Sequence, residues 1–397
     1  METELAIQTI LGLDELIVMD VKISKNRIDI YCCSAFEESL CPSCLKKCKT
    51  VNQEYIKEIR DLPVFGKKVY LQLTERQFYC PNCNRYFTER FSFADVSRRQ
   101  TDRFERQIYK SIKISNINQV IALEDITWET ANEIFSRQYK KEQATKVNKS
   151  VVRFIGMDEF AIKKGHKNFG VVIVDLEQVT IIDVLQNRDK ESLIKYFKTK
   201  GEEWCNAIEF FCSDMWDGFV NAAKSVFPNA KIITDRFHFF FHINKAVDYQ
   251  RKALRKLFKD DADFKNIKYL LLKNGNDLTP EEKLKLEHAF AKSNELKSIY
   301  ESKESLREIF EKKIDKKQAE QELEVWSQKS EKLENKYLNV FLKTLLNWKE
   351  NVLNYFEIRL TSSVIEGINN KIKMIKRMAF GFLNFDNFKC RIIASFG

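Results

Sequence analysis

The feature that most restricts how this chain of 397 residues can fold is a long segment, residues 239–355, that is nearly free of glycine and proline. The segment is rich in Lys, Glu and Leu, a composition typical of helices, so we expect an all-helical block there. Short apolar stretches precede it, and an amphipathic stretch follows it. If that last stretch packs back on the earlier ones, the block interrupts a single sheet domain.

The stretch before the helical block predicts a mixed five-stranded sheet flanked by helices. Strands are expected at 152–158, 169–175, 179–186, 207–213 and 230–235, and helices near 189–200 and 216–226. A short polar turn joins the second and third strands, so these should pair antiparallel. The later strand–helix–strand steps should pair in parallel.

Three acidic residues have positions that suit catalysis. Asp158 and Asp214 each end an apolar, strand-like stretch, and Glu366 lies beyond the helical block. Carboxylates from strand ends and a late helix can hold two divalent cations, the arrangement that phosphodiester chemistry uses. Strand side chains alternate, so Glu159 should face away from Asp158. Alone, each aspartate is more often a turn residue, and Glu366 also fits a capping box that starts at Ser363.

The helix expected around Glu366 has two faces. Its apolar face carries isoleucines at 365, 368, 372 and 375, which should be buried. Glu366 shares the opposite face with Asn370, Lys373 and Arg377, and an acid, an amide and two cations suit contact with phosphate.

A further pair of titratable residues follows the last expected strand. Asp235 and His238 lie one helical turn apart at a strand-to-helix junction. The aspartate can cap the helix, and the histidine can be an ordinary hydrogen-bonded residue. The alternative places His238 near the scissile phosphate as a hydrogen-bond donor or proton shuttle.

The cysteines indicate a structural metal site. Cys41 and Cys44 form one Cys-x-x-Cys pair, and Cys80 and Cys83 form another. Four thiolates in this spacing suit tetrahedral zinc. No apolar stretch reaches the roughly 20 residues needed to span a bilayer, and the N-terminus lacks the basic start of a signal peptide. We therefore expect a cytoplasmic, nucleoid-associated protein with reduced cysteines.

Residues 116–139 predict two helices joined by a tight turn, which resembles a helix-turn-helix. Thr127 should cap the second helix, whose apolar residues Ala131, Ile134 and Phe135 should pack on the first. Residues on its outer face should then face a DNA major groove; these are Trp128, Glu129 and Asn132. An ordinary helical hairpin is the alternative. A polar linker is expected at 140–149.

The net charge of +10 fits a polyanionic partner without requiring one. Arg98, Arg99 and Arg103 precede the helical pair and are candidates for contacts with DNA phosphates, which position a protein without specifying sequence. Trp326 or Trp348 in the helical block can stack on an extruded base, although burial is the commoner fate of tryptophan.

Four stretches together resemble the DDE transposases of bacterial insertion sequences in the ISL-three group. They are Gly-Met-Asp-Glu-Phe at 156–160, Ser-Asp-Met-Trp at 213–216, Thr-Asp-Arg-Phe-His at 234–238 and Val-Ile-Glu-Gly-Ile-Asn-Asn-Lys-Ile-Lys at 364–373. The resemblance implies a ribonuclease-H-like catalytic domain in which Asp158, Asp214 and Glu366 bind Mg²⁺ or Mn²⁺. It also implies double-stranded DNA partners, namely terminal inverted repeats and target DNA, and a homodimer or larger paired-end complex. Thr361-Ser362 departs from the Thr-Asn common in related proteins.

The expected organisation is multidomain α/β. A zinc-binding module covers 1–95, and a helix-turn-helix domain with its linker covers 96–150. The catalytic domain comprises 151–240 and 356–397, separated by the all-helical insertion at 241–355. Two other functions stay open at this point: an inactive or domesticated DNA-binding regulator, and a metal-dependent nuclease that cuts without joining.

Overall fold

The computed structural model describes residues 2–145, 151–163, 168–258, 261–361 and 363–396. The chain forms two compact units, Met1–Val147 and Asn148–Gly397. Each unit is described by itself below.

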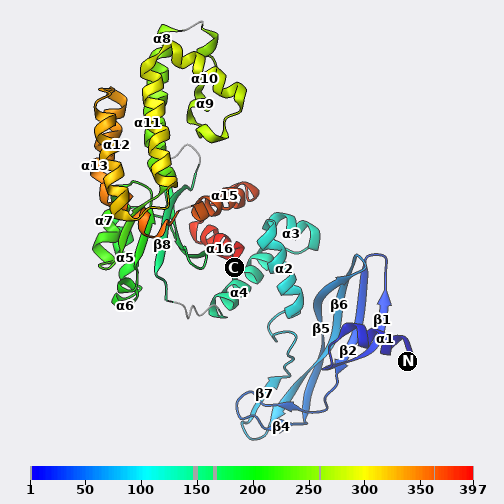
Figure 1. The fold of residues 1–397 in the computed structure, drawn as a ribbon. Helices are drawn as coiled ribbons and strands as arrows, with labels where there is room; N and C mark the ends of the chain where they lie inside the picture. Colours follow the sequence, from blue (N-terminus) through cyan, green and yellow to red (C-terminus); the bar gives the residue numbers. More distant parts are fainter. Residues whose placement is uncertain (1, 146–150, 164–167, 259–260, 362, 397) are drawn as a thin grey trace. The chain divides into compact units, whose positions relative to one another are not determined.

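The first unit is built on a five-stranded sheet (Figure 1). Its strands run in the order β1-β2-β6-β5, with β7 added beside β6. Strands β1 and β2 form an antiparallel hairpin around the polar residues 24–26. Helix α1 and the strands have these bounds: α1 Glu2–Leu11, β1 Leu16–Ile23, β2 Arg27–Ser34, β3 Ser39–Leu40, β4 Lys47–Cys48, β5 Val51–Val64, β6 Lys67–Cys80 and β7 Arg85–Thr88.

Three helices follow in the same unit: α2 Asp102–Ile114, α3 Ile117–Glu124 and α4 Trp128–Thr145. The expected helical pair is confirmed, and Thr127 caps α4 by accepting a hydrogen bond of 3.2 Å from the Thr130 amide. Helix α4 continues beyond the predicted end at 139 because Glu142 pairs with Lys113 of α2 at 3.3 Å. The expected linker at 140–149 is therefore helical through Thr145, and its last residues lie outside the described part of the chain.

The second unit contains the expected mixed sheet, in the order β10-β9-β8-β11-β12. The predicted antiparallel pair is present as β9 and β10, and the predicted parallel pairing holds for β11 and β12. Strand β8 pairs antiparallel with β9 and in parallel with β11, so the step from β10 to β11 does not join paired strands as predicted. The strands are β8 Phe154–Ala161, β9 Phe169–Asp175, β10 Thr180–Leu185, β11 Phe210–Ser213 and β12 Lys231–Thr234.

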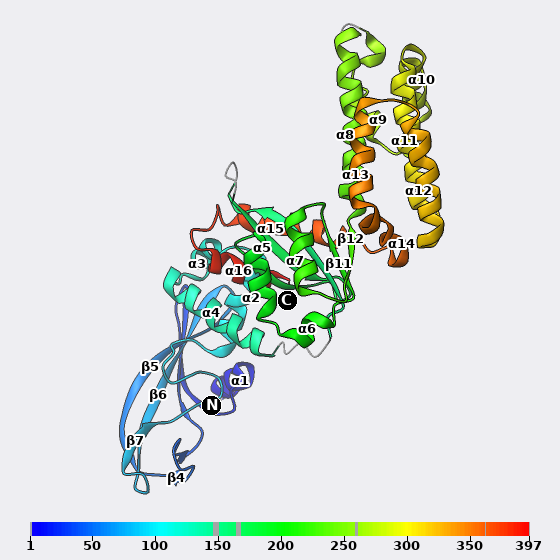
Figure 2. The same ribbon diagram turned by 90° about the vertical axis from the view of Figure 1, so that its left-hand side faces the viewer.

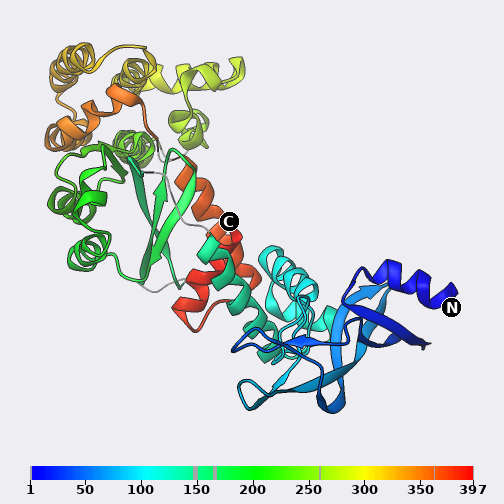
Figure 3. The same cartoon turned by 90° about the horizontal axis from the view of Figure 1, so that it is seen from below.

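Helices cover both faces of this sheet, as Figures 1 and 3 show. Side chains alternate along β9, so Val171 and Ile173 join a core with α5 and α7, while Val172 and Val174 join one with α15 and α16. The predicted isoleucine face of α15 is buried in the second core. These helices are α5 Lys190–Lys198, α6 Glu202–Asn206, α7 Asp217–Val226, α15 Ser363–Met378 and α16 Phe385–Ser395.

The described residues between β12 and α15 are mainly helical, as expected, and form a bundle (Figure 2). The core of the bundle continues into the sheet through Cys212 and Ile233. Trp326 is buried there and donates a hydrogen bond of 2.9 Å to the Ser302 carbonyl, and Trp348 packs against the same core. Its α-helices are α8 Arg236–Leu257, α9 Lys268–Leu272, α10 Pro280–Lys292, α11 Asn294–Glu311, α12 Lys316–Glu331, α13 Lys336–Leu353 and α14 Tyr355–Ile358. No described helix has both the length and the apolarity to cross a membrane.

Candidate active site and zinc-binding site

A cavity of about 750 Å³ lies in the second unit, where the sheet meets the start of α8, helix α11 and helix α15. It brings together side chains from segments that are far apart in sequence. The predicted residues among its lining are Asp158, Asp214, Asp235, His238, Glu366 and Lys373. The cavity therefore contains every residue for which the sequence predicted a catalytic role.

Strand register explains how three aspartates reach one edge of the sheet. Ser213, the last residue of β11, pairs with Met157 of β8 and with Thr234 of β12. The residue that follows each of these three positions is an aspartate. Parallel strands end at the same edge of a sheet, so the three carboxylates are neighbours there.

The prediction that Asp158 ends its strand is wrong. Strand β8 continues to Ala161, and Asp158 pairs with Val172 of β9. The strand extends because β9 supplies a partner on that side as far as Phe169. On its other side β11 has already ended at Ser213, so the edge of β8 next to Asp214 is open to the cavity.

Helix α15 is held close to β8, and this contact places Glu366. A side-chain carbon added to Gly156 would overlap Ile365 of the helix and lie 2.8 Å from Leu176, so a larger residue would require these side chains to shift. Near the other end of the helix, Lys376 donates a hydrogen bond of 2.5 Å to the Ala161 carbonyl. Ser363 is the first helical residue, and residue 362 before it lies outside the described residues.

The amide that contacts the acids is Asn369, which the sequence analysis did not select. Its Nδ2 donates to Asp158 Oδ2 at 2.8 Å, and its side chain is 6% exposed. Asn370, the predicted residue, is exposed and accepts a hydrogen bond of 3.4 Å from Lys373. Lys373 lines the cavity, whereas Arg377 is exposed outside its lining.

Two of the acids in the cavity have raised pKa values. Burial raises the pKa of Asp214 to about 6, and the charge of Asp158 adds to this increase. Burial also raises the pKa of Asp158. Asp214 Oδ1 is buried with no hydrogen-bond partner among the described residues. Glu159, in contrast, is neutralised by an ion pair with Arg188.

Asp235 and His238 have the local arrangement that the sequence predicts. Asp235 caps α8 by accepting a hydrogen bond of 3.3 Å from the His238 amide. The side chains of both residues also line the cavity, and a charged His238 lowers the pKa of Asp158 and of Asp214. Capping and a position beside the acids therefore coexist.

The four predicted zinc ligands form a compact cluster in the first unit. Among the residues that the structure describes, Cys41, Cys44, Cys80 and Cys83 are the one group whose potential ligand atoms all lie within 4.8 Å of one another. Sulfur–sulfur distances are 3.9 Å for Cys41–Cys83 and 3.7 Å for Cys44–Cys80. Tetrahedral zinc with bonds of about 2.3 Å separates its sulfurs by about 3.8 Å, so the cluster fits this ion.

Contacts between the two cysteine turns support the cluster. Lys46 donates to Asn82 Oδ1 at 2.8 Å, and Arg85 donates to Ser43 Oγ at 2.7 Å. A hydrogen bond from the Lys46 amide lowers the pKa of the Cys44 thiol, which favours the thiolate that binds metal.

The outer face of α4 agrees with the helical pattern. Ala131, Ile134 and Phe135 are buried as predicted. Trp128 and Glu129 are exposed, and Asn132 is half-buried.

Two of the three candidate arginines have acidic partners within the unit. Arg103 donates to Asp61 at 2.7 Å, and Arg98 donates to Asp102 at 2.9 Å. Arg99 is exposed and lines a cavity of about 370 Å³ together with Thr127. Arg99 is thus the candidate whose side chain is most accessible to a phosphate.

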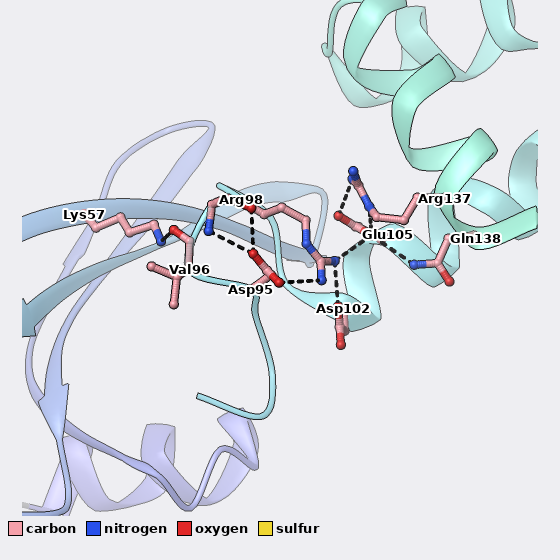
Figure 4. Close-up of polar contacts among 9 residues, drawn as sticks. Lys57, Asp95, Val96, Arg98, Asp102, Glu105, Arg137 and Gln138 are labelled. Carbon is pink, nitrogen blue, oxygen red and sulfur yellow. Dashed lines mark hydrogen bonds and ion pairs between the residues drawn. The ribbon is translucent and has the colours of Figure 1, made fainter. Parts of the chain in front are cut away.

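Arg98 also reaches a buried acid that the sequence analysis did not identify. Figure 4 shows Glu105 of α2 contacted by Arg98 and by two residues of α4. Arg98 donates at 3.0 Å, Arg137 at 2.7 Å and Gln138 at 2.9 Å. Burial raises the pKa of Glu105, but these hydrogen bonds outweigh burial and the net shift is downward. A charged Glu105 therefore ties α4 to α2 and to the loop before it.

Comparisons with known proteins agree with these two sites. Residues 155–392 match a family described as transposase, the DDE family of ISL3 elements. Residues 37–83 match the zinc finger of the transposases of IS204, IS1001, IS1096 and IS1165.

Individual relatives are transposases as well. The chain is 24% identical to the transposase for insertion sequence element IS1001 of Bordetella parapertussis, over 93% of this chain and 91% of that protein. It is 25% identical to the transposase for IS1557 of Mycobacterium tuberculosis, strains CDC 1551 / Oshkosh and H37Rv, over 66% of this chain and 64% of the relative. The chain belongs to the ISL3 family of DDE transposases.

Proposed function

We propose that Asp158, Asp214 and Glu366 are the catalytic acids of this transposase and hold two divalent cations, Mg²⁺ or Mn²⁺, in the cavity of the second unit. The observation that carries the proposal is the convergence of three acids, from β8, the end of β11 and α15, on one cavity. Three antiparallel strands followed by two parallel ones, with the acids at one edge, support a ribonuclease-H-like domain.

The residues of the cavity suit divalent cations. Asp214 Oδ1 and Asn369 Oδ1 are both buried without a partner among the described residues, and such oxygens are the ligands that Mg²⁺ prefers. Burial raises the pKa values of Asp158 and Asp214, so a bound cation would stabilise both as carboxylates. When bound, two cations would activate the attacking oxygen and stabilise the leaving one.

Other residues of the cavity have supporting roles in this proposal. Asn369 orients Asp158 through its hydrogen bond of 2.8 Å. Lys373 is exposed at the cavity and is suited to bind a phosphate that flanks the scissile bond. His238 can donate a hydrogen bond to the same phosphate or move a proton to the leaving oxygen.

We propose that the first unit recognises the terminal inverted repeats of the element. Helices α3 and α4 would act as a helix-turn-helix, with Trp128, Glu129 and Asn132 toward the major groove and Arg99 on a phosphate. The exposure of Trp128, at 45%, supports this assignment because the same helix buries its opposite face. Binding should weaken steeply as salt rises, because phosphate contacts release counterions.

The cysteine cluster is proposed to bind zinc and to hold its end of the sheet together. Protein purified without added metal should contain about one zinc per chain. Replacing Cys80 by Ser should release the metal and unfold the two cysteine turns, whereas Cys48→Ser should keep it. Zinc content measured by mass spectrometry distinguishes these outcomes, and retention of zinc in Cys80→Ser would refute the assignment.

Catalysis is tested by replacing each acid with its amide. Asp158→Asn, Asp214→Asn and Glu366→Gln should each reduce cleavage at the repeat ends by several orders of magnitude and leave repeat binding nearly unchanged. Asp217→Asn is the matched control, because Asp217 lies three residues after Asp214 but outside the cavity. Cleavage that survives Asp214→Asn but not Asp235→Asn would transfer the second role to Asp235.

Joining separates a transposase from a nuclease that only cuts. A cleaved 3′ end should become linked to target DNA when the wild-type protein and a divalent cation are present.

We also propose that the protein acts in the cytoplasm, where bacterial DNA lies, and that at least two copies assemble to pair the two ends. Cleavage of two-ended DNA that depends on the square of protein concentration would support pairing.

A further inference from the structure

Helix α8 carries a row of exposed side chains at four-residue intervals, here called the α8 stripe. It consists of Phe237, Phe241, Lys245 and Tyr249, and all four are exposed. The aromatic members have exposed fractions of 64% for Phe237, 54% for Phe241 and 41% for Tyr249. Residues four apart lie on the same face of a helix, so the stripe is continuous.

The stripe is not needed to bury the helix. The opposite face of α8 already packs Phe239, Ile243 and Val247 into the core of the bundle. A single exposed apolar side chain is common on protein surfaces, but two phenylalanines in line at more than half exposure form a patch that usually contacts a partner.

The stripe begins at the proposed active site. Phe237 lines the cavity that holds the acids and directly precedes His238. Phe240 and Asn244 of the same helix also line that cavity, and each immediately precedes a member of the stripe. A DNA strand whose phosphate enters the cavity therefore passes the first residues of the stripe.

The chemistry of the stripe suits nucleic acid rather than an apolar protein surface. Lys245 lies between Phe241 and Tyr249, and the Lys252 ammonium lies 5.4 Å from the Tyr249 ring. The neighbouring acid, Asp248, is neutralised by Lys252 at 2.9 Å and by a buried arginine, Arg251. Aromatic rings that alternate with lysine can stack bases while the ammonium groups meet phosphates.

The spacing of the stripe favours unpaired bases. Four residues of helix rise by about 6 Å, whereas bases stacked in a duplex are separated by about 3.4 Å along each strand. Phe237 and Phe241 therefore do not match two successive bases of a stacked duplex. Their spacing instead suits unstacked bases, each of which can stack on one phenylalanine ring.

We propose that the α8 stripe binds unpaired bases next to the scissile phosphodiester, with Phe237 and Phe241 as the stacking residues. This assignment rests on the proposed function of the cavity. The bases would be unpaired by strand separation at the element's end, and the stripe would hold them out of the duplex. Chemistry at the cavity then acts on a strand that is already fixed.

The test compares the binding of two DNA molecules to the full-length protein without added magnesium. One carries the terminal repeat fully paired across the cleavage position, and the other leaves three nucleotides there unpaired and includes 2-aminopurine. Wild-type protein should bind the unpaired DNA at least about tenfold more tightly, because each stacked base adds roughly a factor of ten. The 2-aminopurine fluorescence should be quenched on binding.

Three variants sharpen the test. Phe237→Ala with Phe241→Ala should remove the preference and the quenching, while the paired DNA binds as before. Phe237→Trp with Phe241→Trp should keep both, because any flat ring can stack. Tyr269→Ala is the control, since Tyr269 is 76% exposed in the same helical insertion but lies outside the stripe.

Two results would overturn the proposal. The first is a double alanine variant that keeps the preference, or that loses the same affinity for both DNA molecules. The second is unchanged DNA binding with a smaller assembly in light scattering, which would make the stripe an interface between copies. DNA binding and light scattering are measured without cleavage. The proposed catalytic role of Asp158 is tested separately, by whether Asp158→Asn still cuts DNA, so the failure of one proposal can be told from the failure of the other.

Discussion

Glu105 in the first unit and Asp214 in the second are both acids with little access to water, yet their surroundings differ. Glu105 is 0% exposed and accepts hydrogen bonds from two arginines and a glutamine, so its pKa is lowered despite burial. Asp214 has a buried oxygen without a partner among the described residues, and burial raises its pKa to about 6. One charge is compensated within the fold, and the other is not.

The difference separates a structural acid from a binding acid. A buried carboxylate without a partner is costly, and folded proteins usually keep one only where a ligand compensates it. The compensated acid holds helices together in the unit that we assign to repeat recognition. Asp214 lines the cavity that we assign to catalysis, where we propose that a cation is its missing partner.

The largest expected effect is on the compensated acid. Glu105→Ala leaves Arg98 and Arg137 without their buried partner, and breaking such a pair costs about 3–5 kcal/mol. Hydrogen exchange of the amides in α2 and α4 should accelerate accordingly. Glu133→Ala is the control, because Glu133 is exposed on α4. Equal rates of amide hydrogen exchange in the two variants would show that Glu105 does not have this structural role.

Replacing Asp214 should have the opposite effect on stability from replacing Glu105. Because the folded pKa of Asp214, about 6, lies above its ordinary value of 3.8, its contribution to stability falls as the pH rises between these values, and the full cost is present above about pH 6. Asp214→Asn should therefore stabilise the metal-free protein at pH 7.5 by about 1–3 kcal/mol. Mn²⁺ at a hundred times its dissociation constant should stabilise the wild type by about 2.7 kcal/mol and the variant far less. Thermal unfolding of the second unit measures both, and a destabilised variant would contradict the comparison.

A smaller effect is expected at Asn369. Its amide group faces Asp158, a carboxylate that can only accept hydrogen bonds when ionised, so the amide nitrogen must lie on that side. Asn369→Leu should weaken Mn²⁺ binding about 10- to 100-fold, as loss of a residue that orients a ligand does. Asn370→Leu is the matched control and should leave Mn²⁺ affinity unchanged, as measured by electron paramagnetic resonance. Equal losses in both variants would contradict the role of Asn369.

The smallest effect concerns pH. The folded pKa of Glu105 lies below its ordinary value of 4.5, so its stabilising contribution is present above about pH 4.5 and is lost as pH falls through the folded pKa. The stability gap between the wild type and Glu105→Gln should therefore be widest near neutral pH and narrow in acid. Unfolding by urea at pH 7, 5 and 4 measures this gap. A gap that widens in acid would show that the charge of Glu105 does not stabilise the unit.

Much of the fold follows from patterns that are local in sequence. The cysteine spacing predicts the thiol cluster because each pair forms its own turn, and the isoleucines of α15 predict its buried face. The pairs β9–β10 and β11–β12 also follow from the lengths of their connections, whereas the pairing of β11 with β8 does not.

The features that the sequence did not predict are contacts between helices, strands and loops that are distant in the sequence. Asn369 and Asn370 differ by a rotation of about 100° around the axis of α15. The packing of the helix on the sheet sets this rotation, including the contact of Ile365 with the small Gly156 of β8. Arg98 has the composition of a phosphate contact, but its partner Glu105 becomes adjacent only when α2 packs against the loop. Periodicity predicts which face is apolar and does not identify the neighbour of each polar residue.

The position of α15 after the helical bundle has a consequence for how the protein is made. Synthesis runs from the N-terminus, so both aspartates and the unit that we propose to bind the repeats leave the ribosome well before Glu366 does. A polypeptide still being translated, or one cut short by a stop codon before residue 363, would occupy the element's ends without the last acid. Such fragments would compete with intact enzyme and restrain the element that encodes them.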